Sequence, residues 1–127
     1  MKSFASVGLD GLSVAELIRF SASYFREFPN MIPRNSEREA RVYVRSAATV
    51  IDRLCPGGAV QMNYDKAASL LRNISPALAA ASDAYERQDD LARAIMGRAL
   101  ADRCVNLTQR TIKAPQYERA APEITAR

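Results

Sequence analysis

Apolar residues recur at helical spacing through residues 13–28 and stop at a proline. Their spacing of three and four residues places them on one face of a helix. Ser13 followed by Glu16 forms an S-x-x-E capping box, in which each side chain binds a free amide of the first turn. Pro29 disfavours helical geometry in the residue before it, so we expect this helix to end there. The residues on this face are Val14, Leu17, Ile18, Ser21 or Ala22, Phe25 and Phe28.

A second amphipathic pattern covers residues 37–55 and is the best-defined in the chain. Ser36 with Glu39 repeats the capping box, and Pro56 with the two glycines after it ends the helix. The alternation of four and three residues is typical of a helix face buried in a core. We expect that face to consist of Ala40, Val44, Ala47, Ile51 and Leu54, with Tyr43 and Val50 at its edge.

A short third helix is expected after the glycine turn. Asn63 can cap it, and Ser75 with Pro76 ends it and begins the next helix, because proline is well accommodated at a first helical position. The third helix is therefore interpreted as a lid or spacer, and the helices over 13–28 and 37–55, with the last helix of the chain, as the main core.

No proline interrupts residues 76–112, which raises the question of a single long helix. Such a helix would be ~55 Å long at 1.5 Å per residue, well beyond the ~30 Å of a domain of this size. We expect a break in the polar run 86–90, with Asp89 capping a final helix over 90–112. The alternative is one long helix that protrudes and pairs with another copy of the chain.

The apolar residues of the final helix are mostly four residues apart, so their stripe rotates around the helix. Either its two halves face different neighbours, or the helix bends near Gly97. The stripe is predicted to comprise Leu91, Ala92, Ile95, Met96, Leu100, Cys104 and Leu107.

Together these elements predict an all-α protein, a compact bundle of four to five helices. The 127 residues are 48% hydrophobic and 25% charged, as in folded single domains, and no segment alternates as a half-buried strand does. The domain is expected over 13–112, with an N-terminal arm at 1–12 and a flexible C-terminal tail at 113–127.

Cysteine usage and hydropathy favour a cytoplasmic protein. Cys55 and Cys104 are too few for a disulfide scaffold and lack the spacing of a redox or zinc site, so both are interpreted as small core residues. Residues 1–12 do not develop the apolar run of a secretory signal, and no stretch reaches the ~18 apolar residues of a membrane span.

Nothing in the sequence indicates catalysis. Histidine is absent, which removes the commonest general base and metal ligand, and Pro56-Gly57-Gly58 lacks the lysine and the spacing of a phosphate-binding loop. Asp83, Glu86 and Asp90 share a helical face, but a solvated helix start explains acids there better than a cation site does. We therefore expect no enzyme activity, no cofactor and no metal.

One charged feature stands out, a row of arginines opposite the apolar face of the 37–55 helix. Arg38, Arg41 and Arg45 lie within about 60° of one another on that helix, and Arg34 precedes them. Like charges three and four residues apart repel, so helix propensity gives no reason to place them together. An anionic partner would relieve this repulsion.

Three interpretations of the arginine row remain open. Glu37, Glu39 and acids of a neighbouring helix neutralise it, or it binds an acidic protein partner, or it contacts nucleic-acid phosphates. We take the chain for a non-enzymatic interaction module, an adaptor, chaperone-like protein or regulator, that binds an acidic partner through Arg34, Arg38, Arg41 and Arg45. A nucleic-acid binder is the alternative, and the C-terminal helix offers a route to a homodimer.

Overall fold

The computed structural model describes residues 12–120 and confirms the all-helical class: this part of the chain forms four long helices and no strand. A short 3₁₀ turn, η2, follows the second of them. The elements are α2 (Val14–Met31), α3 (Arg38–Leu54), η2 (Pro56–Gly58), α4 (Tyr64–Arg87) and α5 (Leu91–Ala120).

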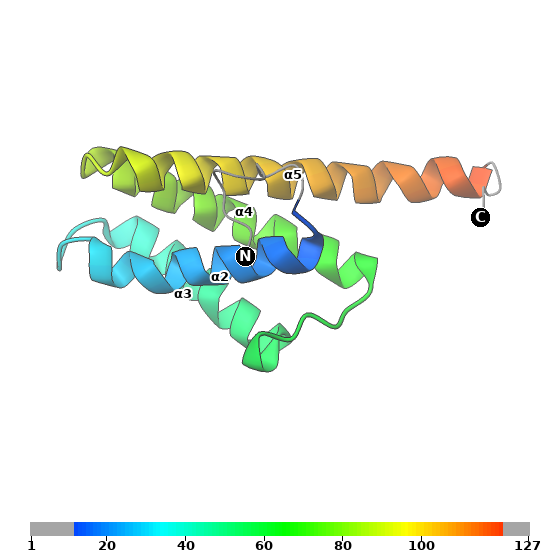
Figure 1. The fold of residues 1–127 in the computed structure, drawn as a ribbon, viewed down its shortest axis with the longest axis horizontal. Coiled ribbons are helices and arrows are strands. Elements are labelled where there is room, and N and C mark those ends of the chain that lie inside the picture. Colours follow the sequence, from blue (N-terminus) through cyan, green and yellow to red (C-terminus); the bar gives the residue numbers. More distant parts are fainter. Residues whose placement is uncertain (1–11, 121–127) are drawn as a thin grey trace.

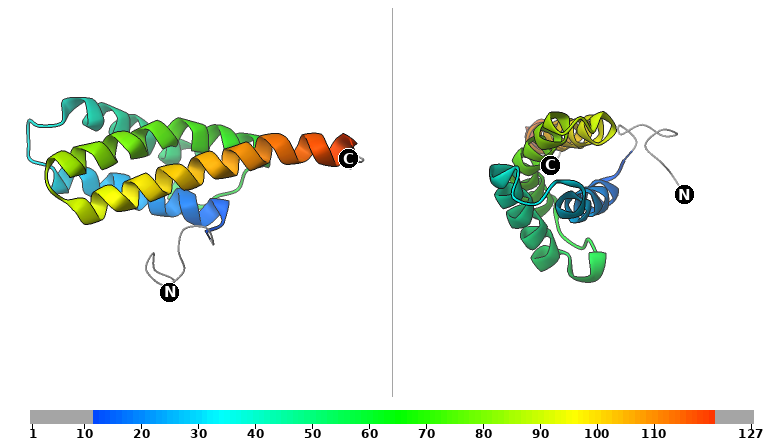
Figure 2. Two further views of the ribbon diagram at one scale, coloured as in Figure 1. Left: turned by 90° about the horizontal axis from the view of Figure 1, so that it is seen from above. Right: turned by 90° about the vertical axis from the view of Figure 1, so that its left-hand side faces the viewer.

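Successive helices run in opposite directions, which makes the fold an up-and-down bundle (Figure 1). α4 contacts each of the other three helices and pairs most extensively with α5. The C-terminal part of α5 extends beyond the first turn of α4 (Figures 1 and 2). The helix expected to be a lid or spacer is therefore the centre of the core, and that expectation was wrong.

The predicted start of α2 is confirmed, whereas its predicted end is wrong. Ser13 Oγ accepts from the Glu16 amide at 3.1 Å, and Glu16 Oε1 accepts from the Ser13 amide at 3.0 Å. The helix continues through Pro29 to Met31, and the Ile32 amide donates to the Phe28 carbonyl. Phe28 and Ile32 are both buried, so packing holds the last turn in place although proline lacks one amide.

The predicted second capping box does not form. Ser36 Oγ donates to the Pro33 carbonyl at 2.6 Å, and the residue before the helix is Glu37, which has a left-handed φ of 55° and makes no side-chain cap bond. A turn within the preceding loop has taken the hydroxyl that the box requires. The helix nevertheless spans nearly the predicted range, and Ala40, Val44, Ala47 and Ile51 are buried as expected, whereas Leu54 is 43% exposed.

Pro76 does not divide the third helix from the fourth. Asn63 caps α4 as predicted, by accepting from the Lys66 amide at 2.9 Å, but the helix then runs unbroken for 24 residues. A proline in a helix interior costs about 3 kcal/mol. Ile74 and Leu78, on either side of Pro76, are both fully buried, and each contributes about 1.5–3 kcal/mol by burial. Packing therefore outweighs the lost hydrogen bond.

The predicted break before the last helix is confirmed, although its cap is one residue later than expected. Asp89 has a left-handed φ of 62° and forms the turn. Asp90 Oδ1 accepts from the Arg93 amide, and the Asp90 carbonyl accepts from the Ala94 amide at 3.0 Å. α5 was expected to end near 112, and its helical backbone continues to Ala120.

The buried face of α5 agrees only in part with the predicted stripe. Leu100 and Cys104 are buried as predicted, and Met96 and Leu107 pack against the core. Leu91 is 59% exposed and Ile95 is 70% exposed, so neither belongs to the core. Most of the buried residues are small and lie three or four apart, and Gly97 among them packs against Tyr24 of α2. The buried residues are Ala94, Gly97, Leu100, Ala101, Cys104 and Thr108.

The two cysteines are buried and free, as the sequence predicted. Burial raises the pKa of the Cys104 thiol to about 12 and also raises that of Cys55. Neither thiol is therefore activated as a nucleophile, because reaction requires the thiolate.

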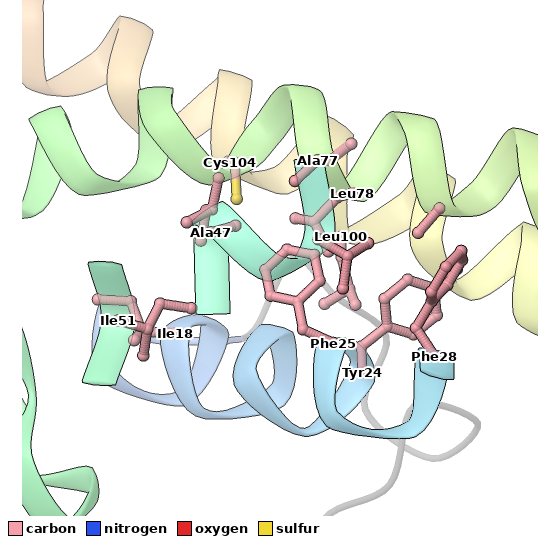
Figure 3. Close-up of a cluster of buried hydrophobic side chains, with 14 of the residues drawn as sticks. Ile18, Tyr24, Phe25, Phe28, Ala47, Ile51, Ala77, Leu78, Leu100 and Cys104 are labelled. Carbon is pink, nitrogen blue, oxygen red and sulfur yellow. The ribbon is translucent and has the colours of Figure 1, made fainter. Parts of the chain in front are cut away.

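An aromatic cluster links α2 to the α4–α5 pair. The Tyr85 ring lies between Tyr24 and Phe28, with ring centroids 5.5 and 5.3 Å apart. Tyr24 Oη donates to the Arg93 carbonyl of α5 at 2.7 Å, directly over Gly97, which has no side chain to block it. Figure 3 shows Tyr24, Phe25 and Phe28 pointing from α2 towards the helices above it.

Of the predicted arm at 1–12, only Leu12 is described, and it is buried in the core. The last part of the predicted tail, 121–127, lies outside the described residues. None of the helices in the described part is long and apolar enough to cross a membrane.

Candidate partner-binding site

The arginines of the predicted row lie around the start of α3, but they are not equivalent. Arg34 lies in the loop before the helix, and Arg38 and Arg45 lie two turns apart along it. All three are exposed. None of the three forms an ion pair with another residue of the part that the structure describes.

Arg41 differs because its guanidinium is bound by its own chain. Its Nε donates to the Ser36 carbonyl at 2.7 Å, and its Nη2 donates to the carbonyls of Ile32 and Pro33 at 3.0 and 2.7 Å. These carbonyls follow the C-terminal end of α2, where a cation is favourable. Arg41 therefore holds the loop between α2 and α3 in place, in addition to adding charge to the row.

We expect Arg41→Ala to lower the free energy of unfolding by about 1–2 kcal/mol, because charge-assisted hydrogen bonds to three carbonyls are lost. Arg45→Ala, a matched change one turn along the same helix, should alter it by less than about 0.5 kcal/mol. Urea denaturation measures both. Equal effects of the two substitutions would show that the loop does not depend on Arg41.

Glu37, a candidate to neutralise the row, is bound elsewhere. Its Oε1 accepts from Arg87 Nη2 at 2.6 Å and from Nε at 3.0 Å, and its Oε2 accepts from Gln88 Nε2 at 3.0 Å. The side chain of Glu37 is only 9% exposed. The hydrogen bonds from Arg87 lower the pKa of the Glu37 carboxyl below its usual value of 4.5. Glu37 thus joins the start of α3 to the end of α4.

This ion pair predicts a pH dependence. Because the pKa of Glu37 is lower in the folded state, its contribution to stability is complete above pH 4.5 and is lost as the pH falls through the lowered value. Glu37→Gln should therefore lower the melting temperature at pH 7, and the difference from the parent should shrink below pH 4.5. Exposed Glu39→Gln is the control. A gap of equal size at pH 7 and pH 3 would contradict this assignment.

A groove runs between α2 and α3. Two hollows of about 510 and 390 Å³ lie next to each other along it, and Arg26 and Asp52 line both. Two views show α3 running obliquely away from the first half of α2 (Figures 1 and 2). We call this the α2–α3 groove. Its α2 wall is Arg19, Ala22, Arg26 and Pro29, and its α3 wall is Arg41, Arg45, Ala48 and Asp52. Beneath the walls lie Ile18, Phe25, Val44 and Ile51, all of which are buried.

The groove has a positive rim. Four arginines and one aspartate line it. Arg19 Nε donates to the Gly58 carbonyl at 3.3 Å, and Arg41 holds the loop. Within the described part of the chain, Arg26 and Arg45 form no ion pair, so their charges are available.

Arg19 and Arg26 were not among the site residues predicted from the sequence. Their signal is the seven-residue spacing, which places them on one face of α2, but nothing in the sequence shows that this face lies beside the arginine row. The pairing of α2 with α3 brings the two sets together.

Three acids near the α4–α5 turn are paired with arginines. Asp83 accepts from Arg98 at 2.7 Å, and Arg93 bridges Asp90 at 2.9 Å and Glu27 at 3.0 Å. The described residues hold no group of three or more His, Cys, Asp or Glu side chains arranged to bind a metal ion.

Comparison of the chain with protein-family models, with curated proteins and with solved structures found no match.

Proposed function

We propose that this protein is a non-enzymatic helical interaction module, an adaptor, chaperone-like protein or regulator, which binds an acidic protein partner. The binding surface is the basic face of α3, formed by Arg34, Arg38 and Arg45. The observation that carries the proposal is that these arginines are exposed and have no ion-pair partner in the described part of the chain, while Glu37 is bound to Arg87. Arg41 supports this face by ordering the loop beside it.

Nucleic acid is the alternative partner, and one feature makes it the weaker one. Asp52 lies in the middle of the α2–α3 groove, where it would repel a continuous polyanion.

We also propose that the protein is located in the cytoplasm, which the two free thiols support. We further propose that it forms a homodimer through α5, because Leu91 and Ile95 are exposed on one face of that helix.

The test is affinity purification of the tagged protein from its own cells at low and at moderate salt, with proteins and nucleic acids both identified. We expect one acidic protein at fixed stoichiometry at both salt concentrations. The double variant Arg38→Glu with Arg45→Glu should lose it, because each reversal replaces attraction by repulsion. The control Arg53→Glu with Arg72→Glu changes the net charge equally at exposed arginines elsewhere.

Retention of the partner by the Arg38 and Arg45 variant would show that the basic face does not bind it. Nucleic acid that elutes with salt, with a log–log slope near 0.9 per phosphate contacted on duplex DNA, would establish the alternative.

A further inference from the structure

We propose that the α2–α3 groove receives an acidic amphipathic helix of the partner. This inference rests on the proposed function and names the part of the partner that is bound. It makes the groove the main docking site and the arginines its charged rim.

The dimensions of the groove fit a helix of about three turns. Its α2 wall extends from Arg19 to Pro29, ten residues along a helix, or ~15 Å at 1.5 Å per residue. The apolar lining residues of the two helices that stay accessible are Ala22 and Pro29 of α2 and Ala48 of α3. The apolar stripe of a partner helix would pack on them, as in other helix-in-groove complexes.

The charges of the groove specify acidic residues on both sides of that stripe. Arg19 and Arg26 are seven residues apart, which corresponds to ~10 Å along the α2 wall. Arg45 stands on the opposite wall. Carboxylates about two turns apart on the partner helix would match the spacing of Arg19 and Arg26, and guanidinium groups bind carboxylates in two-pronged geometry.

Asp52 adds selectivity at the centre of the groove. It lines both hollows together with Arg26, so a partner helix must place a neutral or basic residue there. A uniformly negative chain would meet repulsion at this point, which favours a patterned protein segment over a polynucleotide.

The termini of this chain are poor occupants, because they lack the required charge. Residues 1–11 carry one lysine and one aspartate, and residues 113–127 carry three basic and two acidic side chains. Neither segment has the net negative charge that would complement the rim, so the groove is fitted to another protein.

The test places a photoreactive phenylalanine analogue at Thr49, an exposed residue that lines the groove, in the full chain in its own cells. The control carries the analogue at Asn73, an exposed residue of α4. The crosslinked segment is identified by mass spectrometry. We expect a segment with net negative charge and apolar residues at helical spacing, captured at position 49 and not at 73.

Affinity gives the second readout. The crosslinked segment, made as a synthetic peptide, should bind Arg26→Glu at least about tenfold more weakly than the parent, which corresponds to about 1.4 kcal/mol. Arg72→Glu should bind it as the parent does. Circular dichroism of both variants verifies that they fold.

The inference is wrong if position 49 captures no more than position 73, if it captures nucleic acid, or if the captured segment is not acidic and amphipathic. Arg45 belongs to both surfaces, whereas Arg38 lies outside the groove lining and Arg26 outside the arginine row, so the single variants Arg38→Glu and Arg26→Glu separate the two proposals. A partner that is lost with the Arg38 and Arg45 variant but is not crosslinked at position 49 would leave the proposed function standing without the groove.

Discussion

Replacement of Tyr85 by alanine is expected to lower the free energy of unfolding by about 3–5 kcal/mol, as truncation of a buried large aromatic does. Tyr85 is fully buried, and its ring contacts Tyr24 and Phe28. Removing the ring would leave a cavity at the point where α2 packs on α4. A domain of this size has about 5–15 kcal/mol of stability in all. Urea denaturation followed by circular dichroism measures the loss.

The control is Tyr85→Phe, which separates the ring from its hydroxyl. The Tyr85 hydroxyl is buried and has no hydrogen-bond partner in the described part of the chain. Burial also raises the pKa of Tyr85 to about 12, so the group stays neutral at physiological pH. We expect Tyr85→Phe to leave stability unchanged or to raise it by about 1 kcal/mol, because an unsatisfied polar group is removed. A loss comparable to that of the alanine variant would contradict this description of the core.

Replacement of Gly97 by alanine is expected to lower the free energy of unfolding by about 1–3 kcal/mol. At an unhindered helix position the same change would raise it by about 1 kcal/mol, because alanine is the better helix former. At position 97 a Cβ would lie against the Tyr24 hydroxyl and 2.7 Å from Tyr24 Cζ. Tyr24 is buried and bonded to the Arg93 carbonyl, so a shift of its ring would break that hydrogen bond. The clash therefore outweighs the gain in propensity.

A double-mutant cycle tests this cause. Tyr24→Phe removes the atom closest to the new Cβ, so Gly97→Ala should cost less in that background than in the parent. Thermal denaturation of the four proteins gives the coupling energy. Additive effects, or a Gly97→Ala protein more stable than the parent, would show that Tyr24 does not pack on Gly97 as described.

The contacts of Tyr85 and Gly97 help to fix α2, which forms one wall of the α2–α3 groove. α4 pairs extensively with α5, and α2 is fixed to this pair through Tyr24, Phe28 and Tyr85. α3 is joined at its start by the Arg41 and Glu37 contacts and then runs away from α2. The groove therefore lies between two helices whose positions are fixed independently of any partner, which lowers the entropy lost on binding.

Local sequence determined most of the helical segments. The Ser13 and Asn63 caps, the glycine turn after α3 and the polar break before α5 depend on neighbouring residues only, and the structure has all four. The regular four–three spacing of α3 likewise predicted its buried face, because the apolar side of an amphipathic helix is the side that packs on the core.

Local rules failed where a distant contact competed with them. The same S-x-x-E motif forms a box at Ser13 and not at Ser36, because at Ser36 the loop takes the hydroxyl and Glu37 binds Arg87. Pro29 and Pro76 do not stop their helices, because the flanking turns are anchored by buried side chains.

The sequence by itself determined the helical class, the caps of α2 and α4 and the basic row of α3. Only the tertiary structure decided that α4 is central, that small residues rather than Leu91 and Ile95 form most of the buried face of α5, and that Arg26 faces Arg45 across a groove. The physical reason is the range of the interactions. Capping and periodicity act within one or two turns, whereas the choice of a buried face and the meeting of two charged rows depend on how helices far apart in the chain pack together.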